Sequence, residues 1–125
     1  MSVALLKHVS EMMESLNIPY AFMRWNVHPP DDYYFVGEYT ESEMVTKEED
    51  GRQDTTFILR GFTRKDWLLL EEAKEKIEKS CNKTAILPDG SGIAVFYEYG
   101  MVVPTYDAEL KSIKINLQIQ EWKVN

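Results

Sequence analysis

The clearest hydrophobic pattern of this sequence is a strict alternation of apolar and polar residues near its C-terminal end. The apolar positions are Ile113, Ile115, Leu117 and Ile119, and polar residues fill the positions between them. A period of two predicts a β-strand with one buried face. Glu121 then interrupts the apolar row, and Trp122 falls in the opposite phase. We expect a β-bulge here, or a strand that leaves its own sheet to meet a neighbour.

The middle of the chain predicts a short strand that leads directly into an amphipathic helix. Residues 55–60 are rich in β-branched and apolar side chains, and Gly61 is expected to end this strand. Thr63 is the predicted N-cap of the helix, with Asp66 at the acidic position of a capping box. Spacings of three and four place four side chains on one helical face: Trp67, Leu70, Ala73 and Ile77. An apolar helical face of this kind is expected to pack against a β-sheet.

Shorter signals predict the remaining elements. A first helix is expected over residues 1–16 with Ser2 as its N-cap, and Pro19 explains why it ends. Its predicted apolar stripe consists of Val3, Leu6, Val9, Met13 and Leu16. Further strands are predicted at 20–27, 33–40, 83–87 and 93–99, and the first two are expected to pair antiparallel. Asn82 is predicted to be left-handed, and residues 88–92 have the composition of a turn.

Together these elements predict an α+β fold, a mostly antiparallel β-sheet with two amphipathic helices packed on one face. The expected order is α-β-β-(β)-α-β-β-(β), where parentheses mark the strands that the pattern leaves open. At 125 residues the chain fits a single domain, residues 1–125. This length is sufficient to bury a core without help from a metal or a disulfide.

The charge balance limits the classes of partner. The sequence has 14 Lys and Arg residues against 21 Asp and Glu residues, a net charge of −7. This balance argues against non-specific nucleic-acid binding, but it suits a surface that DNA passes without sticking. The single cysteine, Cys81, excludes an intrachain disulfide and favours a reducing compartment. Because there is neither a signal-peptide pattern nor an apolar run near ~20 residues, we expect a soluble intracellular protein without a membrane span.

The spacing of reactive residues gives no motif for catalysis or metal binding. His8, His28 and Cys81 lie in three separate predicted segments, so they form no metal-binding pattern. Residues 89–92 are glycine-rich but lack the lysine of a phosphate-binding loop. The carboxylates are too scattered to nominate an acid and base pair. We therefore expect a non-enzymatic protein without cofactor or metal, since an enzyme would need a pocket with convergent titratable groups.

An excess of tyrosine and an acidic segment are the two candidate interface features. Tyrosine covers apolar area with a polar tip and is common where proteins meet, although aromatic side chains in strands also pack in cores. Residues 41–53 carry many acidic side chains and form either a hairpin arm or a solvated loop. The candidate assembly residues are Glu41, Glu43, Glu48, Glu49, Asp50, Tyr33, Tyr39, Tyr106 and Trp122.

The layout of the whole chain resembles a family of small bacteriophage tail proteins. The residues that carry the likeness are Ile18-Pro19-Tyr20, Tyr34-Phe35-Val36, Phe57 to Trp67, Val103-Pro104-Thr105-Tyr106-Asp107 and Glu121-Trp122. With its element order and length, the chain is similar to the tail terminator, or tail-completion, proteins of long-tailed phages, which act in head-tail joining.

This resemblance implies a structural part in virion assembly. Proteins of this family form a ring, usually a hexamer, at the head-proximal end of the tail tube, where it stops tube growth and offers a surface for head attachment. The implied partners are further copies of the chain, the tail-tube protein and the head-completion protein, while DNA passes through without specific binding. The implied location is the virion tail of a phage or prophage, assembled in the bacterial cytoplasm. The alternative is a small homo-oligomeric module, unrelated to phages, that binds a ligand or peptide.

Overall fold

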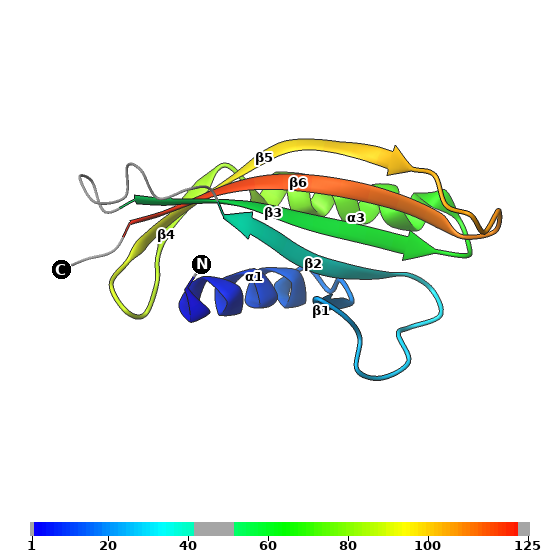
Figure 1. Ribbon diagram of the computed structural model, residues 1–125, viewed down its shortest axis with the longest axis horizontal. Helices are drawn as coiled ribbons and strands as arrows, with labels where there is room; N and C mark the ends of the chain where they lie inside the picture. Colours follow the sequence, from blue (N-terminus) through cyan, green and yellow to red (C-terminus); the bar gives the residue numbers. More distant parts are fainter. Residues whose placement is uncertain (1, 42–51, 123–125) are drawn as a thin grey trace.

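The computed structural model describes residues 2–41 and 52–122, which form two helices and six strands (Figure 1). In chain order these are α1 (Val3–Ser15), β1 (Tyr20–Phe22), β2 (Tyr34–Glu41), β3 (Arg52–Thr63), α3 (Trp67–Ser80), β4 (Lys83–Ile86), β5 (Gly92–Val103) and β6 (Lys111–Trp122). The predicted α+β class and element order are therefore confirmed. The candidate residues Glu43, Glu48, Glu49 and Asp50 lie outside the described residues.

All six strands form one sheet in the order β1-β2-β3-β6-β5-β4. Every neighbouring pair is antiparallel except β1 and β2, which run parallel with Tyr20 opposite Phe35. The predicted antiparallel pairing of these two segments is wrong, because the first strand ends at Phe22 instead of Val27. Met23 adopts a positive φ of 68° and turns the chain out of the strand. The loop between β1 and β2 then returns to the end of the sheet where β1 starts, so β2 runs in the same direction as β1.

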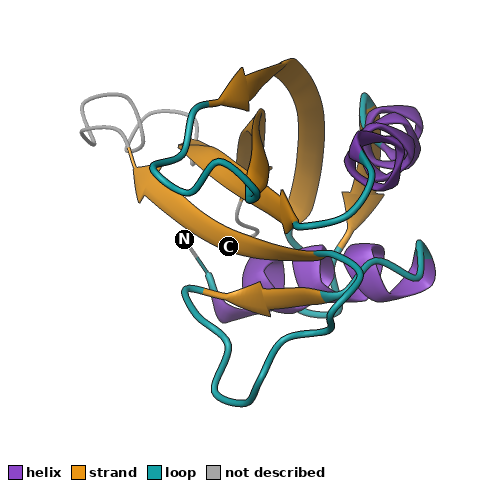
Figure 2. Cartoon of the chain, turned by 90° about the vertical axis from the view of Figure 1, so that its right-hand side faces the viewer, coloured by secondary structure: helices purple, strands orange, loops and turns teal. Residues whose placement is uncertain are grey.

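Both helices lie on one side of the curved sheet, and the core fills the space between the two layers (Figure 2). Alternate residues of β3 and β6 point into this core, and Phe57, Leu59, Ile115 and Leu117 among them are fully buried. The alternation near the C-terminal end therefore identifies the inner face of β6 correctly. Each side chain of this kind contributes roughly 1.5–3 kcal/mol when buried, so the row is a main source of stability.

Helix α1 begins where the sequence predicts, with one change in the face that it buries. The Ser2 side chain accepts a hydrogen bond from the Leu5 backbone N–H at 3.1 Å, so Ser2 is the N-cap. The buried residues are Leu5, Val9 and Met13, whereas Val3 is 69% exposed. The predicted stripe is wrong at Val3, because this residue lies about 120° around the helix from Val9 while Leu5 lies one turn away.

Gly61 lies inside β3 instead of ending it, so the strand reaches Thr63 rather than Arg60. A Cβ at position 61 would come within 2.6 Å of the Phe35 ring on β2. Glycine therefore lets the Phe35 ring lie directly against the neighbouring strand, which is a packing role that the sequence pattern does not reveal.

The N-cap of α3 is Asp66, not the predicted Thr63. Asp66 accepts a hydrogen bond from the Leu68 backbone N–H at 2.9 Å, while the Thr63 hydroxyl donates to the Asp32 carbonyl at 2.6 Å. Both side chains are suited to capping, and the extension of β3 decides between them. The predicted helical face is confirmed, with Leu70, Ala73 and Ile77 buried and Trp67 packed against the core.

The hairpin of β4 and β5 has the predicted turn chemistry. Gly90 adopts a φ of 91°, in the left-handed region, at the tip of the turn. Asn82, with a φ of 63°, connects α3 to β4 as predicted. Strand β5 extends from Gly92 to Val103, beyond the predicted end at residue 99.

Strand β6 stays in register with β3 to its last residue, where Trp122 lies opposite Arg52. The bulge predicted near Glu121 is therefore wrong, and Glu121 continues the inward row with 1% of its surface exposed. The irregularity of the sheet lies in β5 instead, between Tyr97 and Tyr99, where the register with β6 shifts. This bulge divides β5 into a half beside β4 and a half that has no outer neighbour among the described strands.

Candidate functional site

The face of the sheet that points away from the helices carries a mixture of aromatic and polar side chains. At one end Tyr34 stacks on Phe62 with ring centroids 5.4 Å apart, and Trp25 meets Tyr34 edge-on at 6.1 Å. Farther along, the Arg60 guanidinium pairs with the Glu38 carboxylate at 2.7 Å. Such a mixture is typical of surfaces that contact other proteins.

Strand β5 adds exposed apolar side chains at the border of this face. Phe96, Tyr99 and Met101 are all partly exposed and lie opposite polar residues of β6, so they belong to the face without helices. In Figure 1, β5 runs along the upper border of the sheet. Other exposed apolar side chains are scattered over the described chain, but in β5 several of them follow one another along a single strand.

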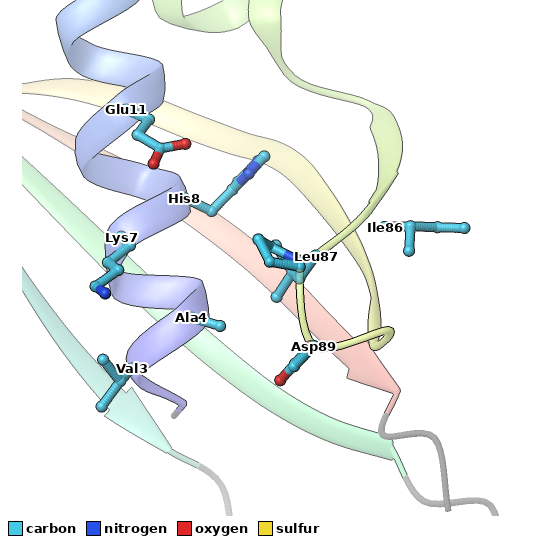
Figure 3. A pocket seen from close by; sticks show the side chains of 9 residues that line it. Val3, Ala4, Lys7, His8, Glu11, Ile86, Leu87 and Asp89 are labelled. Atoms are coloured by element: carbon cyan, nitrogen blue, oxygen red, sulfur yellow. The ribbon is translucent and has the colours of Figure 1, made fainter.

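A groove runs between α1 and the β4–β5 hairpin (Figure 3). Its larger pocket has a volume of about 540 Å³ and is lined by the first turns of α1 and the hairpin turn, including Ala4, Leu87 and Asp89. A second pocket of about 360 Å³ continues toward β4 and the end of α3. His8 and Glu11 line both pockets, so they stand where the two meet. The two pockets together make up this groove.

The titratable side chains that line the larger pocket are Lys7, His8, Glu11 and Asp89. Desolvation lowers the pKa of His8 below its ordinary value of 6.5, and the Glu11 carboxylate opposes this shift only in part. The neutral ring offers one hydrogen-bond donor and one acceptor. On the facing wall, the Asp89 carboxylate accepts from the Ser91 backbone N–H at 2.9 Å and so supports the turn. The groove can hold polar parts of a bound molecule, but within the described chain no hydrogen bond joins His8 to a nucleophile.

Cys81 is buried at the end of α3 and is a poor nucleophile. Burial raises the pKa of its thiol to about 11, and the Glu78 carboxylate adds to the shift. The thiol is therefore protonated near neutral pH. Within residues 2–41 and 52–122, no group of three His, Cys, Asp or Glu side chains is placed to hold a metal ion.

A buried carboxylate, Glu121, lies beneath the N-terminal end of α1. Its Oε2 accepts a hydrogen bond from the Ser2 hydroxyl, and its Oε1 is buried without a hydrogen-bond partner in the part of the chain that the structure describes. Gln53, opposite on β3, is also buried. The positive end of the α1 dipole favours a carboxylate at this place. The alternation of β6 could have identified Glu121 as inward-facing, but the expected bulge placed it outside the core row.

The candidate interface residues that the structure describes lie at opposite ends of the sheet. Glu41 ends β2 and Trp122 ends β6 at one end. Tyr33, which precedes β2, and Tyr106, which follows β5, lie near the other end. Tyr39 lies in β2, close to the first end. The structure therefore does not bring these residues into one patch.

The three tyrosines among these candidates differ in their surroundings. Tyr33 packs against the core and meets the Phe35 ring edge-on at 6.3 Å. Tyr39 stacks on Phe22 with ring centroids 5.9 Å apart, at the helix side of the sheet. Tyr106 is fully exposed in the loop between β5 and β6. Packing thus accounts for two of these residues, and Tyr106 alone of the three is wholly available for contacts.

No protein-family model matches the chain, and no curated protein matches it. Neither described helix is long and apolar enough to cross a membrane. A functional proposal therefore rests on the fold and surfaces described above and on the resemblance noted from the sequence.

Proposed function

We propose that the chain is a non-enzymatic structural protein that forms a ring at the head-proximal end of a bacteriophage tail tube, as a tail terminator. The observation that carries the proposal is the one-sided architecture, in which both helices cover a single face of the sheet. The opposite face keeps aromatic and polar side chains at its surface, where another copy has access to them. A ring joins unlike surfaces head to tail, and a sheet with one free face and a separate groove offers two unlike surfaces.

The charge of the chain is compatible with a ring through which DNA passes. The net charge of −7 opposes lasting contact with phosphates, so DNA would move through without specific binding. The proposed partners are further copies of the chain, the tail-tube protein and the head-completion protein. The proposed location is the virion tail, after assembly in the cytoplasm of a bacterial host.

Tube length is the measurement that tests this function. The chain is added to polymerising tail-tube protein, taken from the gene that we expect just downstream, and tube lengths are measured by electron microscopy. We expect shorter tubes with a ring at one tip, because a cap removes the growing end. The same chain after heat unfolding is the control. Unchanged lengths and bare tips with the folded chain would count against the proposal.

A second candidate function is a small homo-oligomeric module that binds a ligand or peptide. The groove between α1 and the β4–β5 hairpin favours it, because a pocket of about 540 Å³ falls in the range of small-molecule sites. The neutral His8 ring and the Glu11 carboxylate would supply the polar contacts. If the folded chain leaves tube growth unchanged, this module becomes the better supported function.

A further inference from the structure

We propose that the outer edge of β5, from Tyr99 to Val103, is where a second copy of this chain docks by adding a strand to the sheet. The inference rests on the proposed function, since it names one side of the contact between neighbouring copies. It is carried by the pairing of the strands, the exposure of the side chains and the distribution of charge.

The edge of β5 is the least protected edge of the described sheet. Pairing between β4 and β5 ends at Lys83 and Val95, so the rest of β5 has β6 on one side only. The terminal strands β1 and β4 are three and four residues long, and the free end of β2 carries Glu38 and Glu41. Short strands and charged residues are the usual means of protecting an edge. From Tyr99 to Val103, β5 is neither short nor charged.

The backbone of this stretch presents hydrogen-bonding groups to the outside. The Tyr97 N–H donates to Asn82 Oδ1 at 3.3 Å, so Tyr97 directs its backbone away from β6. The bulge then inserts one residue and turns Tyr99 toward β6. Because the direction alternates along an antiparallel strand, Gly100 and Val102 direct their N–H and C=O groups to the free edge. An added strand would pair with these two residues.

The side chains of the stretch are apolar on both faces of the sheet. Met101 is 48% exposed on the face without helices, and Val102 is 55% exposed on the other face. Tyr99 lies beside Met101 on the same face and is partly exposed. A docked strand would remove part of this apolar surface from water, in addition to forming the backbone hydrogen bonds.

The charge distribution favours a second copy as the occupant. Residues 99–106 contain no charged side chain, so two chains that each carry a net charge of −7 meet here with the least repulsion. Lys114 lies opposite Met101 on β6, and no ion pair holds it within the described residues. Its cation suits the acidic surface of another copy, which is complementary in charge.

A charge at the free edge tests this docking surface. Val102→Lys places an ammonium group where an added strand would lie, and its exposed position should leave folding intact. Val27→Lys is the matched control, since Val27 is 71% exposed in the loop before β2 and gains the same charge. Sedimentation velocity from about 1 µM to about 300 µM measures the self-association of each chain, and far-UV circular dichroism verifies its fold.

We expect the wild-type chain and Val27→Lys to self-associate alike, and Val102→Lys to associate at least about tenfold more weakly. A wild-type chain that stays monomeric over the whole range overturns the inference, as does a Val102→Lys chain that assembles normally. The tube-length measurement separates the two proposals. Association through β5 without tube capping would contradict the proposed function but not the docking surface. Capping by a Val102→Lys chain that associates normally would contradict the docking surface but not the proposed function.

Discussion

A single histidine makes the surface of α1 sensitive to pH. The His8 ring is half-buried in the groove, and desolvation keeps its pKa below 6.5 although Glu11 lies one turn away. The folded chain therefore resists protonation at this ring more than the unfolded chain does. Between the folded pKa and 6.5, the unfolded state binds more protons, and stability must rise with pH.

We predict that the free energy of unfolding falls as pH drops from 6.5 toward the folded pKa of His8. His8→Gln removes this titration, so the difference in stability between wild type and variant should change only in that window. Urea unfolding at several pH values measures the stabilities, and an NMR titration of the His8 ring gives the folded pKa. A folded pKa at or above 6.5 would contradict the prediction.

Helix α3 begins at an N-cap that a single side chain, Asp66, supplies. Only Arg64 and Lys65 separate β3 from the cap of this helix. Both are exposed and form ion pairs with the loops beside them, Arg64 with Asp107 at 2.6 Å and Lys65 with Asp32 at 2.8 Å. Exposed ion pairs stabilise little, so the Asp66 cap carries most of the local preference for starting the helix there.

We predict that Asp66→Ala lowers the free energy of unfolding by about 1 kcal/mol, because the Leu68 N–H loses its acceptor. Asp66→Asn keeps an acceptor oxygen at the same place and should cost much less. Urea unfolding of the two variants and the wild type measures both effects. Equal losses for Ala and Asn would show that the side-chain hydrogen bond is not what starts α3.

The sequence predicts those elements in which a single repeating pattern runs through the whole element. The alternation from Ile113 to Ile119 identifies β6 and its inner face, and the spacing from Leu70 to Ile77 identifies the buried face of α3. It fails where a tertiary contact decides, as at Gly61, whose lack of a side chain admits the Phe35 ring from another strand. Competing local signals are the second cause of failure, since two residues could cap α3 and only the length of β3 selects one.

The candidate site was harder to predict than the fold, because its parts come from distant segments. The groove pairs α1 with the β4–β5 turn, and no local pattern indicates that these two lie side by side. The free edge of β5 depends on where β4 ends and on the bulge after Tyr97, both of which follow from strand pairing. The inward position of Glu121 can be predicted, since strict alternation along β6 places it on the inner face.

At the scale of the whole molecule, all six described strands belong to one sheet. The three tryptophans sample different regions of it: Trp25 beside β2, Trp67 at the start of α3 and Trp122 at the end of β6. The core residues of both helices and of the central strands form a single cluster. Such a continuous core is expected to unfold in one step.

We predict that urea unfolding is two-state, as the single-domain prediction requires. Tryptophan fluorescence and far-UV circular dichroism should then give the same midpoint. Variants that retain one tryptophan, with phenylalanine at the other two positions, report each region separately. Fluorescence and circular dichroism midpoints that differ within one such variant would indicate that part of the molecule unfolds independently.

The hydrogen bond from Ser2 to Glu121 brings the first turn of the chain against its last strand. A short linker from Trp122 to Ser2 would therefore span little distance, and the chain could be reopened at the exposed tip around Gly90. Such a circular permutant would keep every strand neighbour of the sheet. Its new ends would emerge at the hairpin turn that faces His8 across the groove, which offers a position for a reporter group that leaves the edge of β5 untouched.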